Sequence, residues 1–293
     1  MLQVAVVGVP NAGKSTLTNV LVGKKVSAVS ARSNTTQDSH LGAFTEGATQ
    51  VTLYDTPGVV TTSKYRDTSH ATRVRSAWTA AADSDVLLLV LDAHRQVTRP
   101  DPRVLALVEH LAQGPLPDWD PPPALLVLNK VDLLPKDADQ RLQLLATKLT
   151  KTAAFEKVYS VSATRGTGMA ELRSDLLARA TPGAWVMRAT QHTDKTPLDL
   201  AQEVVREKFF RRVRDELPYD LKFGTSEVNL LRDGSIRIEL PLLMANSRLV
   251  KMVVGARGCV IGEIGITARK ELIALLKRNV HLILPVKLDK QAR

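Results

Sequence analysis

The sequence predicts an α/β protein in which a mostly parallel sheet carries helices on both faces, followed by a smaller α+β domain. Three observations favour this organisation. Apolar strand segments alternate with helical segments up to residue 178, as is typical of parallel sheets. The first strand leads directly into Gly-x-x-x-x-Gly-Lys-Ser at 8–15. A stretch containing proline and glycine, 181–197, then separates this pattern from one with a different order of elements.

The elements of the first domain follow from runs of apolar residues and from apolar positions repeating every three to four residues. We predict strands at 3–8, 41–46, 50–55, 85–92, 124–129 and 157–161. We predict helices at 14–22, 71–82, 101–113, 137–150 and 168–178. Residues 113–123 are too rich in proline for either and should form a surface loop. The predicted boundaries are a first domain at 1–181, a linker at 182–196 and a second domain at 197–293.

The segment at 8–15 is typical of a cradle for the phosphates of a nucleoside triphosphate. Its glycines let backbone N–H groups face the phosphates, Lys14 reaches the β and γ oxygens, and the Ser15 hydroxyl is placed to bind Mg²⁺. The positive end of the following helix dipole points at the same anion. The predicted nucleotide contacts here are Gly8, Asn11, Ala12, Gly13, Lys14, Ser15 and Thr16.

Two later segments indicate that the nucleotide is GTP. Asn129-Lys130-Val-Asp132 ends an apolar strand, and the Asp132 carboxylate can accept two hydrogen bonds from guanine that adenine cannot donate. Asn129 should connect this segment to the phosphate loop, and the Lys130 stem can lie along the base. The pair Ser162-Ala163 resembles the loop whose backbone N–H groups contact the guanine O6.

Two segments between these motifs have the residues expected around Mg²⁺ and the γ-phosphate. Asp55-Thr-Pro-Gly58 ends a strand, so Asp55 can hold Mg²⁺ through water and the Gly58 N–H can meet the γ-phosphate. Thr36, in a polar loop, is the expected second hydroxyl on the ion. We therefore predict Lys14, Thr36 and Gly58 as catalytic and Ser15, Thr36 and Asp55 as metal-binding.

Composition and charge favour RNA as a partner of the second domain. The net charge is +10, and residues 182–293 contain 20 Lys and Arg against 13 Asp and Glu. No strongly amphipathic basic helix with bulky apolar anchors stands out, so we expect RNA rather than a membrane, and no DNA. No apolar run approaches the length of a transmembrane segment, although peripheral membrane contact is compatible with this charge. The single cysteine, Cys259, fits a reducing compartment.

The second domain has the predicted order of a KH-type RNA-binding domain. A helix at 198–217 precedes strands at 221–230 and 235–244, then two helices joined by Gly255-Ala-Arg-Gly258, and a strand at 280–287. A Gly-x-x-Gly turn between helices lets a nucleic-acid backbone approach closely. A glycine-linked helix pair without RNA is the alternative. The predicted RNA contacts are Lys251, Gly255, Ala256, Arg257, Gly258, Arg269 and Lys270.

With these residues, the whole chain resembles the Era family of GTPases. Segments beyond the GTPase motifs contribute to the resemblance, and they are Thr193-Asp-Lys, Val205-Arg-Glu-Lys, Glu216-Leu-Pro-Tyr, Gly265-Ile-x-Ala-Arg-Lys and Val280-His-Leu. The resemblance implies a P-loop GTPase domain followed by a type II KH domain. It also implies hydrolysis of GTP to GDP and phosphate, and engagement of the 3′ region of small-subunit ribosomal RNA during small-subunit assembly.

Departures from the family pattern refine these expectations. Gln37 stands where the family usually has arginine, and Pro241-Leu-Leu-Met replaces a more acidic segment. Val59 occupies the position of a water-orienting glutamine in Ras-like enzymes, so intrinsic hydrolysis should be slow. Asn11 matches the position where related GTPases bind K⁺, although it can instead satisfy amides of its own loop.

Three alternatives remain open at this level. The proline loop and the basic pI of about 9.8 favour the mitochondrial matrix, with the bacterial cytoplasm or a plastid as alternatives. A double-GTPase assembly factor of the EngA type is disfavoured because one Gly-Lys-Ser loop is present. A GTPase signalling switch acting on a protein or a membrane remains the alternative function.

Overall fold

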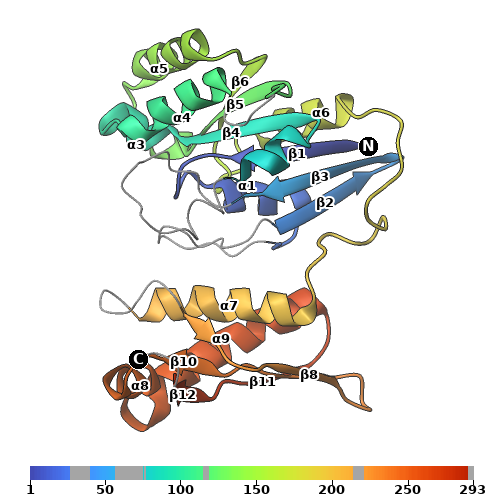
Figure 1. Cartoon of the computed structure of the whole chain (residues 1–293), viewed down its shortest axis with the longest axis vertical. Helices are drawn as coiled ribbons and strands as arrows, with labels where there is room; N and C mark the ends of the chain where they lie inside the picture. The colour runs from blue at the N-terminus through green and yellow to red at the C-terminus, as the bar shows by residue number, and fades with distance from the viewer. Residues whose placement is uncertain (27–39, 57–74, 76, 115–118, 214–220, 290–293) are drawn as a thin grey trace. The chain divides into compact units, whose positions relative to one another are not determined.

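The chain forms two compact units, Met1–Asp194 and Lys195–Arg293, as seen in a computed structural model (Figure 1). The structure describes residues 1–26, 40–56, 75, 77–114, 119–213 and 221–289. Thr36 and Gly58, predicted as catalytic, lie outside these ranges, as do Gln37 and Val59.

The first unit is built on a sheet of six strands in the order β2-β3-β1-β4-β5-β6. β2 and β3 are antiparallel, and the other neighbouring strands are parallel. The strands confirm those predicted for this domain and are β1 (Leu2–Val7), β2 (His40–Glu46), β3 (Thr49–Asp55), β4 (Val86–Asp92), β5 (Ala124–Asn129) and β6 (Lys157–Val161). β4 and β5 are almost entirely apolar and buried, as strands covered by helices on both faces must be.

The helices of the first unit pack as two groups on this sheet. α1 and α6 contact each other and β3, whereas α3 and α4 both contact α5. The helices are α1 (Lys14–Val22), α3 (Ala93–Thr98), α4 (Pro102–Gln113), α5 (Asp139–Thr152) and α6 (Met169–Ala178), and residues 77–82 are also helical. α3 was not predicted, because its six residues are too few to show a helical period. No helix among the described residues is both long and apolar enough to cross a bilayer.

Residues 182–194, here called the connecting segment, pack on the first unit over the stretch that we predicted to be a linker. The buried Gln50 amide donates to the Met187 carbonyl at 2.9 Å and accepts from the N–H groups of Val186 and Met187 at 3.0 Å. Further along, the Ala43 N–H donates to the His192 carbonyl at 2.9 Å. Because Gln50, 137 residues before Met187 in the sequence, holds this segment, the first compact unit extends to Asp194.

The second unit has the predicted order of elements, but its long strands are divided. α7 (Pro197–Arg212) begins at a capping box formed by Thr196 and Asp199, and it ends before the predicted residue 217 because Val213 adopts an extended conformation. α8 (Ser247–Val254) and α9 (Cys259–Leu276) follow the strands and flank the Gly-x-x-Gly turn. The core of this unit is formed by apolar residues from all three helices and from the strands.

Each of the three strands predicted for the second unit splits into two that join different sheets. β8 (Glu227–Leu230), β9 (Ile236–Glu239) and β11 (Val280–Ile283) form one sheet, and β7 (Lys222–Phe223), β10 (Leu242–Met244) and β12 (Val286–Leu288) form the other. The breaks fall at 224–226, 240–241 and 284–285, which contain Gly224, Pro241 and Pro285. Proline cannot donate to a strand ladder, so the chain changes sheets there.

Replacing Gln50 by alanine should destabilise the first unit and release the connecting segment. The change leaves two N–H groups and a carbonyl of the segment without their partner, which costs about 2–3 kcal/mol in the free energy of unfolding. Urea denaturation measures this loss, and trypsin should cleave faster after Arg188. The matched control is Gln143→Ala on the exposed face of α5, which should change neither. Equal effects of the two variants would contradict the role of Gln50.

Candidate functional site: a phosphate loop, two guanine loops and a Gly-x-x-Gly turn

The phosphate loop, residues 8–15, connects the end of β1 to the start of α1, where backbone N–H groups of the first turn have no partner within the helix. Gly13 has a φ of +94°, and a Cβ there would lie 2.3 Å from the Asn129 side-chain nitrogen. Only glycine therefore fits between the loop and β5. Ser15 and Thr16 lie in the first turn of α1, as predicted.

Lys14 lies across its own loop. Its ammonium donates to the carbonyls of Gly8 at 3.0 Å and Val9 at 3.2 Å, and the residue is 7% exposed. Burial lowers the pKa of Lys14 from 10.5 to about 8, and the nearby Asp55 carboxylate opposes this shift. A phosphate anion beside Lys14 would stabilise the ammonium and oppose this lowering of its pKa.

Asn129 joins three segments that are far apart in the sequence. It is 2% exposed, donates to the Ala12 carbonyl at 3.0 Å and accepts from the Ala163 N–H at 3.1 Å. The predicted contact between Asn129 and the phosphate loop is confirmed. The same side chain also places Ser162-Ala163 beside it, and the buried Ser162 hydroxyl accepts from the Arg165 N–H at 3.1 Å.

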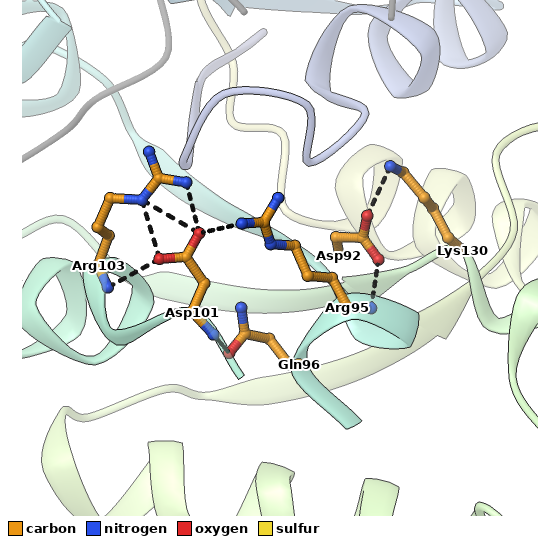
Figure 2. Close-up of polar contacts among 6 residues, drawn as sticks. All are labelled: Asp92, Arg95, Gln96, Asp101, Arg103 and Lys130. Atoms are coloured by element: carbon orange, nitrogen blue, oxygen red, sulfur yellow. Dashed lines mark hydrogen bonds and ion pairs between the residues drawn. The ribbon is translucent and has the colours of Figure 1, made fainter. Parts of the chain in front are cut away.

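Lys130 and Asp132 follow β5 on the same edge of the sheet as the phosphate loop. Lys130 has a φ of +67°, and its ammonium donates to the Asn11 carbonyl at 2.7 Å. The same ammonium donates to Asp92 Oδ2 at 2.6 Å (Figure 2). Asp132 lies in a short 3₁₀ turn, Val131–Leu133, and is exposed. Asp92 was not predicted as a site residue, although a carboxylate at the end of the otherwise apolar strand β4 could have indicated one.

Asp55 is fully buried at the end of β3, which pairs with β1 next to the phosphate loop. The Thr56 hydroxyl donates to the Val6 carbonyl at 2.8 Å and fixes the chain where β3 ends. A carboxylate and a hydroxyl are the oxygen ligands that Mg²⁺ prefers, so Asp55 and Ser15 fit a magnesium ion bound with the nucleotide.

The Gly-x-x-Gly turn of the second unit projects a short exposed backbone segment between α8 and α9. Gly255 ends α8 and has a φ of +72°, and its N–H donates to the Lys251 carbonyl at 2.9 Å. Arg257 has a φ of +52° and is exposed together with Ala256. A Cβ at Gly255 would lie 2.6 Å from Val260, whereas a Cβ at Gly258 would meet nothing within 4 Å. Gly255 is therefore required by packing, and Gly258 borders open space.

The four predicted cations of the second unit, Lys251, Arg257, Arg269 and Lys270, are all exposed. Lys251 lies in the last turn of α8, and Arg257 lies within the Gly-x-x-Gly turn. Arg269 and Lys270 lie on α9, about 17 Å along the helix axis from the turn, given a rise of about 1.5 Å per residue. The arrangement suits an extended polyanion with several phosphates better than a single phosphate.

A family model described as a 50S ribosome-binding GTPase matches residues 3–130. The GTP-binding protein ERG of Arabidopsis thaliana is 39% identical over 98% of this chain, which spans 65% of the length of that relative. The GTPase Era of Maricaulis maris is 37% identical over 97% of this chain and 90% of its own length.

Two solved structures match both units. An Era variant of Aquifex aeolicus bound to GDP and AlF₄⁻ has a TM-score of 0.84 and 29% identity, covering 99% of this chain and 95% of that chain. Era in complex with MgGDPNP and nucleotides 1506–1542 of 16S ribosomal RNA also has a TM-score of 0.84 and 29% identity, covering 99% and 94%.

The lowered pKa of Lys14 predicts that nucleotide affinity falls as the pH rises above 7. The free site loses the Lys14 proton near pH 8, and binding must restore it. The affinity for GDP should therefore fall about fourfold between pH 7 and 8.5, below the pH at which guanine ionises. Isothermal titration calorimetry measures this change in affinity. The dependence of the binding enthalpy on the ionisation enthalpy of the buffer reports the number of protons taken up. A constant affinity without proton uptake would contradict the lowered pKa.

Proposed function

The chain belongs to the Era family of GTPases, and we propose that its GTP cycle controls binding of the second unit to small-subunit ribosomal RNA during assembly of the small ribosomal subunit. In this proposal the second unit is a KH domain of type II, and the partner is the 3′ region of the RNA within the assembling subunit. The supporting observation is the Gly-x-x-Gly turn, where Gly258 borders open space beside the exposed Arg257.

In the GTP site, each residue has a role that follows from its position. The Lys14 ammonium would leave its two loop carbonyls for the β- and γ-phosphates, and the N–H groups at the start of α1 would face the same anion. Asp132 would accept two hydrogen bonds from guanine, while Asn129 holds its loop in place. Ser15 and Asp55 would hold Mg²⁺, which supplies positive charge to the phosphates.

Hydrolysis should be slow without a partner, because the predicted machinery relies on positioning and charge rather than on a side-chain base. Lys14 and the loop N–H groups would stabilise charge on the γ-phosphate as it is transferred to water. Thr36 and Gly58, outside the described residues, are proposed to complete this set.

The proposed compartment is the mitochondrial matrix, which imaging of a fluorescent fusion of the full-length protein would distinguish from a plastid or a bacterial cytoplasm.

Replacing Gly258 by aspartate should weaken RNA binding and leave GTP binding intact. The side chain would enter open space, and aspartate tolerates a positive φ better than most residues, so the second unit should remain folded. Its carboxylate would then face an approaching phosphate. We expect at least tenfold weaker binding to a 3′ small-subunit RNA fragment in the GTP-bound state, measured by fluorescence anisotropy.

The control for this experiment is Asp233→Asn, an exposed change in the hairpin between β8 and β9. It should leave RNA affinity within twofold. Equal RNA binding by wild type and Gly258→Asp would contradict the proposed RNA site. Absence of RNA binding by the wild type in both nucleotide states would instead favour a signalling switch that acts on a protein or a membrane.

We also propose that K⁺ binds beside Asn11 and accelerates hydrolysis. Asn11 is exposed in the phosphate loop with a φ of +65°, so Asn11→Gly removes the side-chain oxygen without backbone strain. Wild type should hydrolyse GTP several-fold faster in KCl than in NaCl, and the variant should lose this difference while retaining nucleotide binding. Phosphate release in the two salts, with and without RNA, measures it. Equal wild-type rates in both salts would contradict the K⁺ site.

A further inference from the structure

The carboxylate of Asp92 joins β4 and α3 to the 129–132 segment of the nucleotide site, and the mechanism above does not use it. Asp92 is the last residue of β4, and its two oxygens have different partners. Oδ2 accepts from the Lys130 ammonium at 2.6 Å, and Oδ1 accepts from the Arg95 backbone N–H at 2.8 Å, where it caps α3 (Figure 2). One side chain therefore joins β4, α3 and the guanine loop.

The Lys130 ammonium donates to two acceptors, and both lie outside the 129–132 segment. Besides Asp92, the ammonium donates to the Asn11 carbonyl of the phosphate loop at 2.7 Å. The Asp92 side chain is 15% exposed and that of Lys130 is 30% exposed, so the ion pair is partly shielded from water. Charge-assisted hydrogen bonds of this length fix geometry as well as contribute energy.

α3 also has contacts that do not involve Lys130. The guanidinium of Arg95 lies 3.2 Å from Asp101 Oδ2, and the Arg103 side chain also contacts this carboxylate (Figure 2). Asp101 is nearly buried and caps α4 in turn. The Asp92 oxygens are thus oriented by the cap of α3 before any nucleotide binds.

We propose that Asp92 is a positioning residue for the guanine nucleotide. Its carboxylate holds the Lys130 ammonium on the Asn11 carbonyl, so that the Lys130 stem and the phosphate loop keep the spacing that the bound nucleotide needs. Asp92 thereby slows nucleotide release. The inference rests on the guanine-nucleotide site described above, and it adds a residue of β4 to a site otherwise assigned to loops and strand ends at 8–15, 129–132 and 162–163.

The test is the release rate of fluorescently labelled GDP in stopped-flow experiments with excess unlabelled GDP. Asp92→Asn keeps an oxygen that can cap α3 but removes the charge that holds Lys130. We expect release about tenfold faster than from wild type, with little change in melting temperature. Asp92→Ala also removes the cap, so it should release GDP at least as fast and melt at a lower temperature.

Two further variants separate positioning from general loosening. In a Lys130→Met background, Asp92→Asn should change the release rate less than twofold, because the partner of the carboxylate is gone. Asp175→Asn is the matched control, a partly shielded carboxylate on α6 that pairs with Arg179 at 2.7 Å rather than with Lys130 or the phosphate loop. It should lower the melting temperature and leave release within twofold of wild type.

The proposal is overturned if Asp92→Asn releases GDP within twofold of wild type, or if it accelerates release equally in the Lys130→Met background. It is also overturned if Asp175→Asn accelerates release as much as Asp92→Asn does. Failure of wild type to bind labelled GDP at all would reject the nucleotide site itself, and is read from the binding step before any variant is compared.

Discussion

The side-chain amide of Asn129 is the contact on which the geometry of the nucleotide site depends. Its nitrogen donates to the phosphate loop at Ala12 and its oxygen accepts from Ala163, so both functions of the amide are used within one buried side chain. Leaving a buried amide without a partner costs more free energy of folding than the hydrogen bond itself contributes. The phosphate loop, the end of β5 and the segment at Ala163 therefore depend on one another for their positions. The same contact requires glycine at position 13, because any side chain there would displace the Asn129 amide.

Residues whose chemistry depends on the ends of strands could be predicted from the sequence. Asn129, Lys130 and Ser162 follow apolar strand segments, and carboxyl ends of parallel strands meet at one edge of a sheet, so their proximity follows from topology. The alternation of strands and helices in the first unit was predictable because its elements show as runs and repeats of apolar residues. Thr36 and Gly58 lie outside the described ranges and stay predictions.

Features that depend on contacts between distant segments could not be predicted in this way. The place of Asp92 at a strand end could have indicated a site residue, but its pairing with Lys130, 38 residues later in the sequence, appears only in the structure. The three divided strands of the second unit read as continuous because proline and glycine within a short apolar run do not reveal that the two halves join different sheets. The buried Gln50 likewise gives no sign in sequence of the segment that it holds.

The connecting segment also protects the sheet that it covers. β2 is an outermost strand, and a strand of this kind presents unpaired backbone groups that can template pairing with another molecule. Here the outward N–H of Ala43 is taken by the His192 carbonyl, and Gly42 pairs with Thr193 as an antiparallel bridge. A first unit cut at residue 181 would expose this edge, so solubility of an isolated GTPase unit depends on thirteen residues that composition assigns to neither domain.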